Sequence, residues 1–265
     1  MTAHRIFDWT PQAVVFDCDG TLVDSERHWE QARDIVLREH GVAVDPGFAE
    51  RSKGLHYTEC GALMARLAGR PDAREEMTEQ LLARFRDLVA QRPVAVRGAQ
   101  ALVTSLSRRA PLAVASNCPA DVVEFCLRSV GLRHHFRHVV VPETGVRPKP
   151  LPDPYVEAAR RLGVDCGSAL AVEDSINGIK AAVGAGLRVI GVGRQPSREA
   201  VALVDLWVEA LDDPRLMAWA ENRPATARRV KAEHTGASSA HPMVPRQGSR
   251  AQTGSRAQTG SRAVP

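Results

Sequence analysis

Long apolar runs are missing from this sequence. No window approaches the roughly eighteen consecutive apolar residues that a membrane-spanning helix needs. The segment from Met1 to Thr10 also lacks the apolar core of a secretory signal peptide. We therefore expect a soluble, cytoplasmic protein that does not act at a membrane. We also expect a monomer, although no sequence feature fixes the oligomeric state.

Cysteines are few, and their spacing excludes two further classes of protein. There are 5, none of them in a Cys-x-x-Cys pair, and the odd number leaves one without a disulfide partner. This argues against a disulfide framework and against a zinc site, and it fits a reducing cytoplasm. The cysteines are Cys18, Cys60, Cys118, Cys126 and Cys166.

Charged residues are plentiful but unevenly placed. Residues 221–265 contain eight Lys and Arg against two Glu, whereas residues 1–220 contain 27 Lys and Arg against 29 Asp and Glu. The net charge of +4 therefore says little about the substrate. The same C-terminal stretch repeats Gly-Ser-Arg-Ala-Gln-Thr from Gly248 and again from Gly254. We predict that 221–265 form a disordered basic tail, and we expect no nucleic-acid partner.

One apolar run ends abruptly in two carboxylates, at Val14-Val15-Phe16-Asp17-Cys18-Asp19-Gly20. The pattern predicts a strand followed by a loop at the carboxyl end of a sheet, where ligands of α/β proteins bind. Two acids this close repel each other unless a cation lies between them or one keeps its proton. The stretch therefore indicates a divalent cation, or a nucleophile beside an acid. A structural turn stays open as the alternative, because Asp-x-Asp-Gly is also common turn chemistry.

The rest of the chain divides into two kinds of periodicity. Residues 24–92 show only helical spacing of apolar residues, whereas short apolar runs and helical segments alternate from Val94 onward. Alternating strands and helices predict an α/β fold, a three-layer Rossmann-like core with a mostly parallel sheet. We assign the core to 1–23 and 93–220 and an inserted α-helical cap to 24–92, placed over the Asp17 loop.

Local signals give the bounds of individual elements. Helices are expected over 25–40, 60–68, 77–88, 99–107, 121–130, 155–162 and 176–185, and further strands over 112–116, 138–141, 169–172 and 187–192. Ser25 or Asp24 is placed to cap the first helix, and Asp121 to Glu124 is typical of an acidic capping box.

Polar residues follow four of the predicted strands and should meet at one edge of the sheet. They are Asp17 with Asp19, Ser116 with Asn117, Lys149, and Glu173 with Asp174. Each has an ordinary structural explanation, but all four explanations holding together is improbable. The set suits phosphoryl transfer, in which a carboxylate attacks phosphorus and Mg²⁺ offsets the charge repulsion. A second acid can protonate the leaving alcohol and then deprotonate water.

Four stretches resemble the four motifs of the haloacid dehalogenase superfamily, and within it the branch of β-phosphoglucomutases and sugar-phosphate phosphatases. They are Asp17-Cys18-Asp19-Gly20-Thr21, Ser116-Asn117, Lys149-Pro150 and Glu173-Asp174-Ser175-Ile176-Asn177-Gly178. The resemblance implies that Asp17 is the nucleophile, which forms an aspartyl-phosphate, and that Asp19 is the general acid and base. It implies Mg²⁺ bound by Asp17, the Asp19 main-chain carbonyl and Asp174, with Glu173 as a further or outer ligand.

The resemblance also implies how the substrate is bound. Ser116 and Lys149 would bind the transferring phosphoryl group, and Asn117 would support their loop. In the cap, Lys53, His56 and Tyr57 follow an irregular glycine-containing loop and are candidate substrate contacts, with a solvated loop as the alternative.

Three functions remain to be compared. Mutases of this branch have a His after the first motif and a cap Arg for a second phosphate, where this chain has Trp29 and Tyr57. We therefore favour a phosphatase that hydrolyses a small phosphorylated sugar or polyol over a sugar-phosphate mutase. A non-catalytic phosphate-binding protein is the third reading, which the second acid, Asp19, argues against.

Overall fold

The computed structural model describes residues 6–44, 47–52 and 55–222, and its central element is a six-stranded sheet. The strand order is β3-β2-β1-β4-β5-β6, and every neighbouring pair is parallel. The strands are β1 (Ala13–Phe16), β2 (Leu112–Ala115), β3 (Phe136–Val140), β4 (Ala169–Glu173), β5 (Arg188–Val192) and β6 (Leu206–Val208). β1 lies in the middle, so the acids that follow it lie near the centre of the sheet edge.

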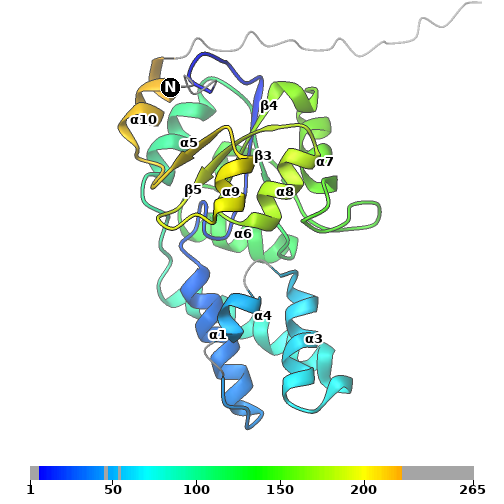
Figure 1. The fold of residues 1–265 in the computed structure, drawn as a ribbon. Helices are drawn as coiled ribbons and strands as arrows, with labels where there is room; N and C mark the ends of the chain where they lie inside the picture. The colour runs from blue at the N-terminus through cyan, green and yellow to red at the C-terminus, as the bar shows by residue number, and fades with distance from the viewer. Residues whose placement is uncertain (1–5, 45–46, 53–54, 223–265) are drawn as a thin grey trace, which may run out of the picture. The chain divides into compact units, whose positions relative to one another are not determined.

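Helices cover both faces of the sheet. Successive side chains of β1 point to opposite sides, and because they are apolar on both sides, both faces must be buried. Val14 and Phe16 belong to one hydrophobic cluster, and Ala13 and Val15 belong to the other. The first cluster contains buried residues of α5 (Ala99–Ser107), α6 (Ala120–Ser129) and α10 (Pro214–Asn222). The second contains those of α7 (Asp153–Leu162), α8 (Ile176–Gly184) and α9 (Arg198–Leu203). The predicted three-layer α/β fold is confirmed (Figure 1).

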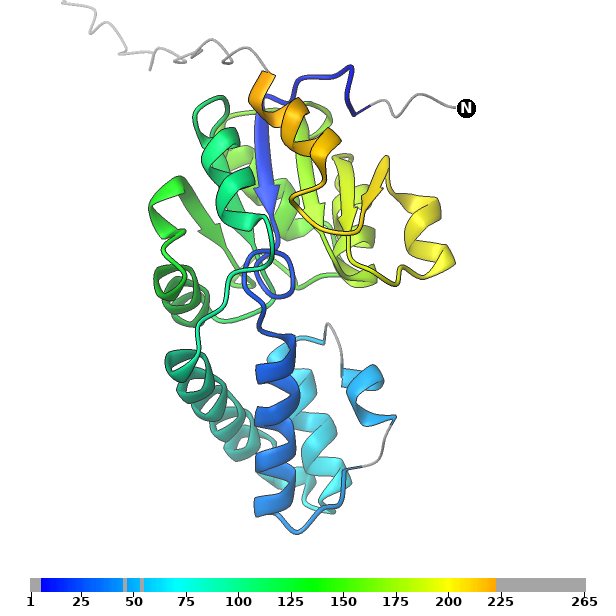
Figure 2. The ribbon, with the colours of Figure 1, turned by 90° about the vertical axis from the view of Figure 1, so that its left-hand side faces the viewer.

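A block of helices lies between β1 and β2 in the chain and below the sheet in Figure 1. Its elements are α1 (Glu26–Glu39), α2 (Phe48–Ser52), α3 (Tyr57–Leu67), the 3-10 turn η1 (Pro71–Ala73) and α4 (Arg74–Gln91). Figure 2 shows α1 and α4 side by side, and the Trp29 and Phe85 rings stack between them at 3.7 Å. The block and the sheet belong to one compact unit, Met1–Ala227. The bounds 24–92 for a separate cap therefore stay a proposal.

Several local predictions need correction. Ser25 is the N-cap residue of α1 but makes no side-chain capping bond, because its hydroxyl donates to Asp19 instead. The capping box at Asp121 was wrong as well: α6 begins after Pro119, and Asp121 pairs with Arg86 of α4. The structure also contains elements that the sequence patterns did not indicate. These are α2, β6, α9, α10 and the 3-10 turns η1, η2 (Arg133–His135) and η3 (Cys166–Ser168).

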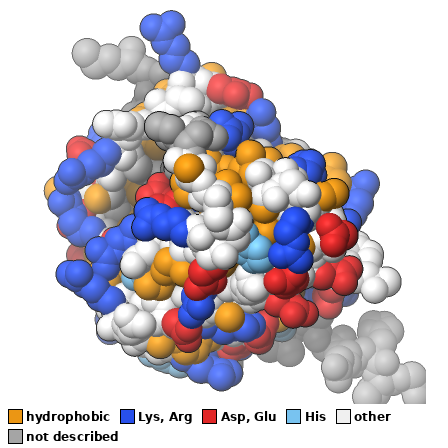
Figure 3. Space-filling view, turned by 90° about the horizontal axis from the view of Figure 1, so that it is seen from below, with side chains coloured by type: hydrophobic (Ala, Val, Ile, Leu, Met, Phe, Trp, Pro, Cys, Tyr) orange, Lys and Arg blue, Asp and Glu red, His pale blue; other side chains and the backbone are white. Residues whose placement is uncertain are grey.

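Surface and tail add two observations. The face in Figure 3 shows Lys and Arg side chains interspersed with Asp and Glu, as on an ordinary solvated surface. None of the helices within the described ranges is long and apolar enough to cross a membrane. The predicted tail beyond Asn222 lies outside the described residues, so its disorder stays a proposal.

Candidate active site

The carboxyl ends of the strands bring the predicted polar groups together. Asp17 directly follows β1, and Glu173 ends β4 with Asp174 next in the chain. Asp17, Glu173 and Asp174 each offer a carboxylate oxygen, and these oxygens all lie within 4.8 Å of one another. Three acids at this spacing form a cluster that could bind a metal ion.

Lys149, in the loop after β3, lies inside this acidic cluster. Its Nζ donates to Asp17 Oδ1 and to Glu173 Oε1, each at 2.6 Å, and the side chain is buried. Burial opposes the charge on the ammonium, but the carboxylates of Asp17 and Glu173 outweigh it and raise the pKa of Lys149 well above its usual value. Tyr155 of α7 donates its hydroxyl to Glu173 Oε1 at 2.9 Å. Lys149 is therefore a fixed cation with one ammonium proton left for a further acceptor.

The surroundings of Asp17 fit a bound cation. Burial, and then the charge of Glu173, raise the pKa of Asp17 well above its usual value. Lys149 lowers this pKa but does not cancel the rise, so a further cation would stabilise the ionised carboxylate. Its Oδ2 atom is buried and has no hydrogen-bond partner among the described residues. Gly20 (φ +85°) gives the room needed nearby, because a Cβ there would lie 2.5 Å from Asp174 Oδ2. Mg²⁺ takes carboxylate oxygens as ligands, so this Oδ2 atom fits a place among them.

Asp19 points to a different set of partners. Its Oδ1 accepts from Ser25 Oγ at 2.7 Å and from Trp29 Nε1 at 3.0 Å, and its Oδ2 accepts from the Cys118 thiol at 3.1 Å. Its side chain is absent from the acidic cluster, so the two acids of the first motif have different environments. Different environments give two carboxylates different roles.

Ser116 and Asn117 organise the loop after β2. Ser116 is buried, and its Oγ accepts from the Cys118 amide at 3.0 Å, which leaves the hydroxyl proton available for another acceptor. The Asn117 side chain accepts from the Lys149 amide at 2.8 Å and donates to the Lys149 carbonyl at 3.0 Å. Asn117 therefore fixes the backbone that positions the lysine.

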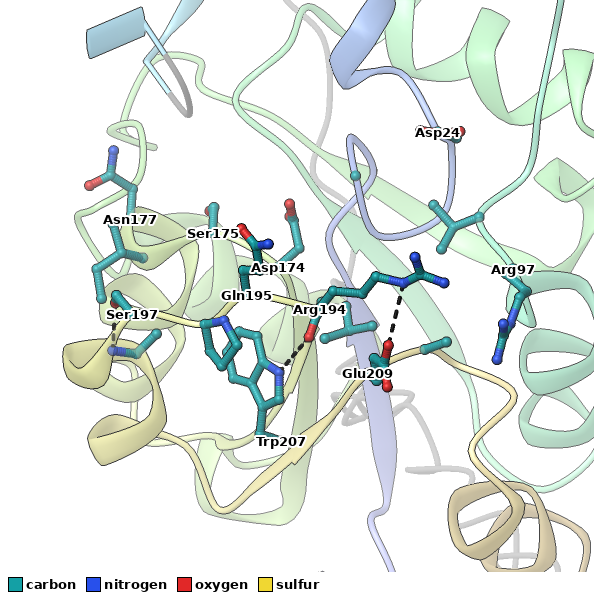
Figure 4. Close-up of a pocket in the computed structure, with 18 residues that line it drawn as sticks. Asp24, Arg97, Asp174, Ser175, Asn177, Arg194, Gln195, Ser197, Trp207 and Glu209 are labelled. Carbon is teal, nitrogen blue, oxygen red and sulfur yellow. Dashed lines mark hydrogen bonds and ion pairs between the residues drawn. The ribbon is translucent and has the colours of Figure 1, made fainter. Parts of the chain in front are cut away.

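Asp174 lines two hollows, and of these two only the smaller is also lined by Asp17 and Asp19. The larger, about 860 Å³, opens beside β5 and β6 (Figure 4). There Arg194 faces Glu209 at 3.4 Å, so opposite charges compensate each other. The smaller, about 80 Å³, is lined by Asp17, Asp19 and side chains of the helical block. The smaller hollow is therefore the candidate site, because Asp17, Asp19 and Asp174 all line it.

The cap residues are only partly where the sequence placed them. Tyr57 lines the smaller hollow, whereas His56 is not among its lining residues and bonds to Thr58 through Nδ1. Lys53 lies outside the described residues. The sequence analysis missed Arg33 of α1, which is buried and lines the same hollow. Its spacing of four residues from Trp29 places both on one face of the helix, a signal that could have indicated it.

A family model for haloacid dehalogenase-like hydrolases matches residues 11–186. The chain belongs to this family. The match spans the first acidic loop through α8 and therefore includes all four motifs. The recognition made from those motifs is confirmed.

Curated relatives of this haloacid dehalogenase-like hydrolase are named as phosphatases. It is 30% identical to 6-phosphogluconate phosphatase of Escherichia coli K12. The alignment spans 180 residues and covers 67% of this chain and 80% of the relative. It is 32% identical over 183 residues to hexitol phosphatase B of the same organism, covering 68% and 82%. These relatives place it among the phosphoric monoester hydrolases of the family.

A solved structure agrees with this fold. CbbY from Rhodobacter sphaeroides in complex with phosphate has a TM-score of 0.68 and 28% identity, and covers 77% of this chain and 96% of CbbY. The sheet and the helical block thus have a close counterpart in a solved protein.

Proposed function

We propose that this hydrolase is a Mg²⁺-dependent phosphatase that hydrolyses a small phosphorylated sugar or polyol through an aspartyl-phosphate on Asp17. The observation that supports it most is the cluster of Asp17, Glu173 and Asp174 oxygens within 4.8 Å, beside the Lys149 ammonium. The names of the relatives, which include hexitol and 6-phosphogluconate phosphatases, support the choice of substrate class.

The proposed cation ligands are the side chains of Asp17 and Asp174 and the main-chain carbonyl of Asp19. When bound, Mg²⁺ would offset the mutual repulsion of these acids and of the substrate phosphate. Glu173 is fully buried and accepts from Lys149, Tyr155 and the Ser175 hydroxyl. We therefore give Glu173 an outer role, in which it orients Lys149 and the loop that contains Asp174.

Asp17 and Asp19 divide the chemistry between them. Asp17 attacks phosphorus through one carboxylate oxygen, while its other oxygen would be the ligand of the cation. As the phosphorus–oxygen bond to the leaving alcohol breaks, Asp19 donates a proton to that oxygen. Asp19 then takes a proton from the water that attacks the aspartyl-phosphate, which regenerates Asp17 and releases inorganic phosphate.

The remaining polar groups bind the phosphoryl oxygens. Lys149 and the Ser116 hydroxyl each have a proton left to donate, and both side chains are buried. Donors fixed in a water-poor site stabilise the charge of the transition state strongly. Asn117 contributes by fixing the Lys149 backbone through its two bonds.

Phosphate release from a panel of phosphorylated sugars, polyols and sugar acids tests the proposal. Wild-type protein should release phosphate in Mg²⁺ and stop when the metal is chelated. Asp17→Asn should lower kcat by at least about a thousandfold, because the amide cannot accept the phosphoryl group. Asp165→Asn, the same substitution at an exposed position, should leave kcat unchanged.

Other outcomes of the same assay identify the alternatives. Isomerised product with little net phosphate release, stimulated by a bisphosphate, would indicate a mutase. Saturable binding of phosphate esters without turnover in Mg²⁺ would indicate a non-catalytic protein. Unchanged turnover in Asp17→Asn would exclude the aspartyl-phosphate mechanism.

A further inference from the structure

Arg33 is a charged side chain buried beside the reactive acids. It belongs to the middle of α1, only 4% of it is exposed, and it lines the hollow that also contains Asp17 and Asp19. A guanidinium remains charged when buried and is costly to bury unless its donors are satisfied. Its position in the site therefore needs an explanation.

Among the described residues, two donors of Arg33 have no hydrogen-bond partner. They are Nε and Nη2, both buried. These two nitrogens lie on the same edge of the guanidinium and direct their protons in parallel, in the arrangement that binds two oxygens of one carboxylate or phosphate. The unused edge therefore matches an acceptor with two oxygens.

The neighbouring side chains that the structure describes do not fill this edge. Glu26 Oε1 lies 3.6 Å from Nη2, beyond hydrogen-bond distance, and the Glu26 side chain is 33% exposed. An ion pair at that distance and exposure is screened by water and is weak. Burial raises the pKa of the nearby Cys60 thiol to about 11, and the charge of Arg33, together with a side-chain contact to it, opposes that rise. A neutral thiol does not compensate a cation.

We propose that Arg33 binds a second anionic group, on the leaving part of the substrate. The substrates would then be phosphate esters that also contain a carboxylate or a second phosphate, such as phosphorylated sugar acids. The Nε and Nη2 edge would donate two charge-assisted bonds to that group while the ester phosphate lies at Asp17. This inference rests on the proposed phosphatase function and adds the class of leaving group.

A matched pair of substrates tests it. 6-Phosphogluconate and glucitol 6-phosphate differ only at carbon 1, where one has a carboxylate and the other a hydroxymethyl group. We expect the wild-type protein to prefer the acid in kcat/KM by at least about tenfold. Arg33→Gln should lower kcat/KM for the acid by on the order of 100-fold, and for the polyol by less than tenfold, because two charged bonds are lost only with the acid. A hexose 1,6-bisphosphate as third substrate distinguishes a second phosphate from a carboxylate.

Two further variants separate charge, geometry and position. Arg33→Lys keeps the charge but not the paired donors, so it should recover only part of the loss. Arg38→Gln removes an exposed arginine from the same helix and should leave kcat/KM unchanged for both substrates. If Arg33→Gln does not fold, wild-type protein alone gives the answer: gluconate should inhibit competitively at concentrations at which glucitol does not.

The outcomes distinguish this inference from the function on which it rests. Equal losses with both esters in Arg33→Gln, a preference for glucitol 6-phosphate, or equal inhibition by gluconate and glucitol would each overturn the role of Arg33. Absence of phosphate release from every ester would instead overturn the phosphatase proposal.

Discussion

Asp19 owes its orientation to the first turn of the helical block. Two of its three hydrogen-bond donors, the Ser25 hydroxyl and the Trp29 indole, lie at the start of α1, and the third is the Cys118 thiol. The Trp29 ring is itself fixed by stacking on Phe85 of α4. Proton transfer depends on the distance and angle of the acid, so in the proposed mechanism α1 would act on the chemistry through Asp19.

Replacing the indole tests this coupling. Trp29→Phe keeps an aromatic ring for Phe85 but removes the bond to Asp19 Oδ1. We expect kcat to fall about tenfold, the effect of roughly 1.4 kcal/mol from one lost hydrogen bond to the Asp19 carboxyl group, with a smaller change in KM. Steady-state kinetics with a single phosphate ester measures both constants.

A matched indole elsewhere in the molecule is the control. Trp219→Phe in α10 also removes one indole bond, to the Trp9 carbonyl at 3.4 Å. Its kcat should equal that of the wild-type protein. Equal losses of kcat in the two variants would show that Trp29 acts only through general stability and not through Asp19.

For single residues, the sequence predicted the polar groups that follow the strands, but it missed Arg33 and Cys118, which lie beside the acids. Asp17, Ser116, Lys149 and Asp174 follow strand ends, where topology alone brings them together. Arg33 was missed because its role depends on which face of α1 meets the acids, and helical periodicity gives the face but not the neighbour. Cys118 contacts Asp19 across 99 residues of chain, a distance over which no local pattern extends.

Element by element, apolar periodicity predicted the long helices well and their ends poorly. α1 and α4 have buried residues at helical spacing and occur where expected. The start of α6 was wrong because Asp121 pairs with Arg86 of another helix, a tertiary contact that local capping rules omit. β6 and α9 were missed because each has only a few apolar residues, too few to establish a period.

Helix α7 provides a prediction of pH dependence. Arg160 Nε and Arg161 Nε lie 2.6 Å and 2.7 Å from the Glu157 carboxylate, and the hydrogen bonds from Arg160 and then Arg161 lower the pKa of Glu157 to about 2. Because the folded pKa lies below the unfolded value near 4.5, the ionised side chain stabilises the fold above that pH. This contribution is lost as the pH falls toward 2.

Urea unfolding of Glu157→Gln at several pH values measures it. The difference in unfolding free energy from the wild-type protein should be constant between pH 7 and about 5, and should shrink as the pH falls below the unfolded pKa. We expect less than about 1 kcal/mol, since Arg160 is exposed and water screens the pair. Glu30→Gln, at an exposed position of α1, is the control. A difference that grows with acidification would contradict the sign of the shift.

For the whole molecule, the size of the hollow constrains how substrate enters. About 80 Å³ is far below the roughly 300 Å³ at which small-molecule pockets begin. Side chains of α1 and Tyr57 of α3 line it opposite the acids of the sheet, so a sugar phosphate needs these helices to move outward. The same side chains would then exclude water once the ester is bound, which in the proposed mechanism would favour transfer to Asp17 over direct attack by water on the ester.

We expect the stability and activity of the compact unit, Met1–Ala227, not to depend on the C-terminal stretch. The family model ends at residue 186 and the compact unit at Ala227, whereas the predicted basic tail extends to the end of the chain. A chain that ends at Ala227 keeps α10, whose Leu216 and Trp219 are buried in the main hydrophobic cluster. We expect its melting temperature to change by less than about 1 °C and its kcat/KM to stay the same, because Leu216 and Trp219 are retained.

Removing α10 as well gives the opposite expectation. A chain that ends at Val208 loses the buried side chains of Leu216 and Trp219, and we expect about 4 kcal/mol or more of destabilisation. Thermal unfolding of both shortened chains beside the full one makes the comparison. A loss of kcat/KM in the longer of the two, without a change in melting temperature, would contradict the separation. It would indicate that the basic residues beyond Ala227 attract the anionic substrate toward a sheet-containing unit whose own charge is slightly negative.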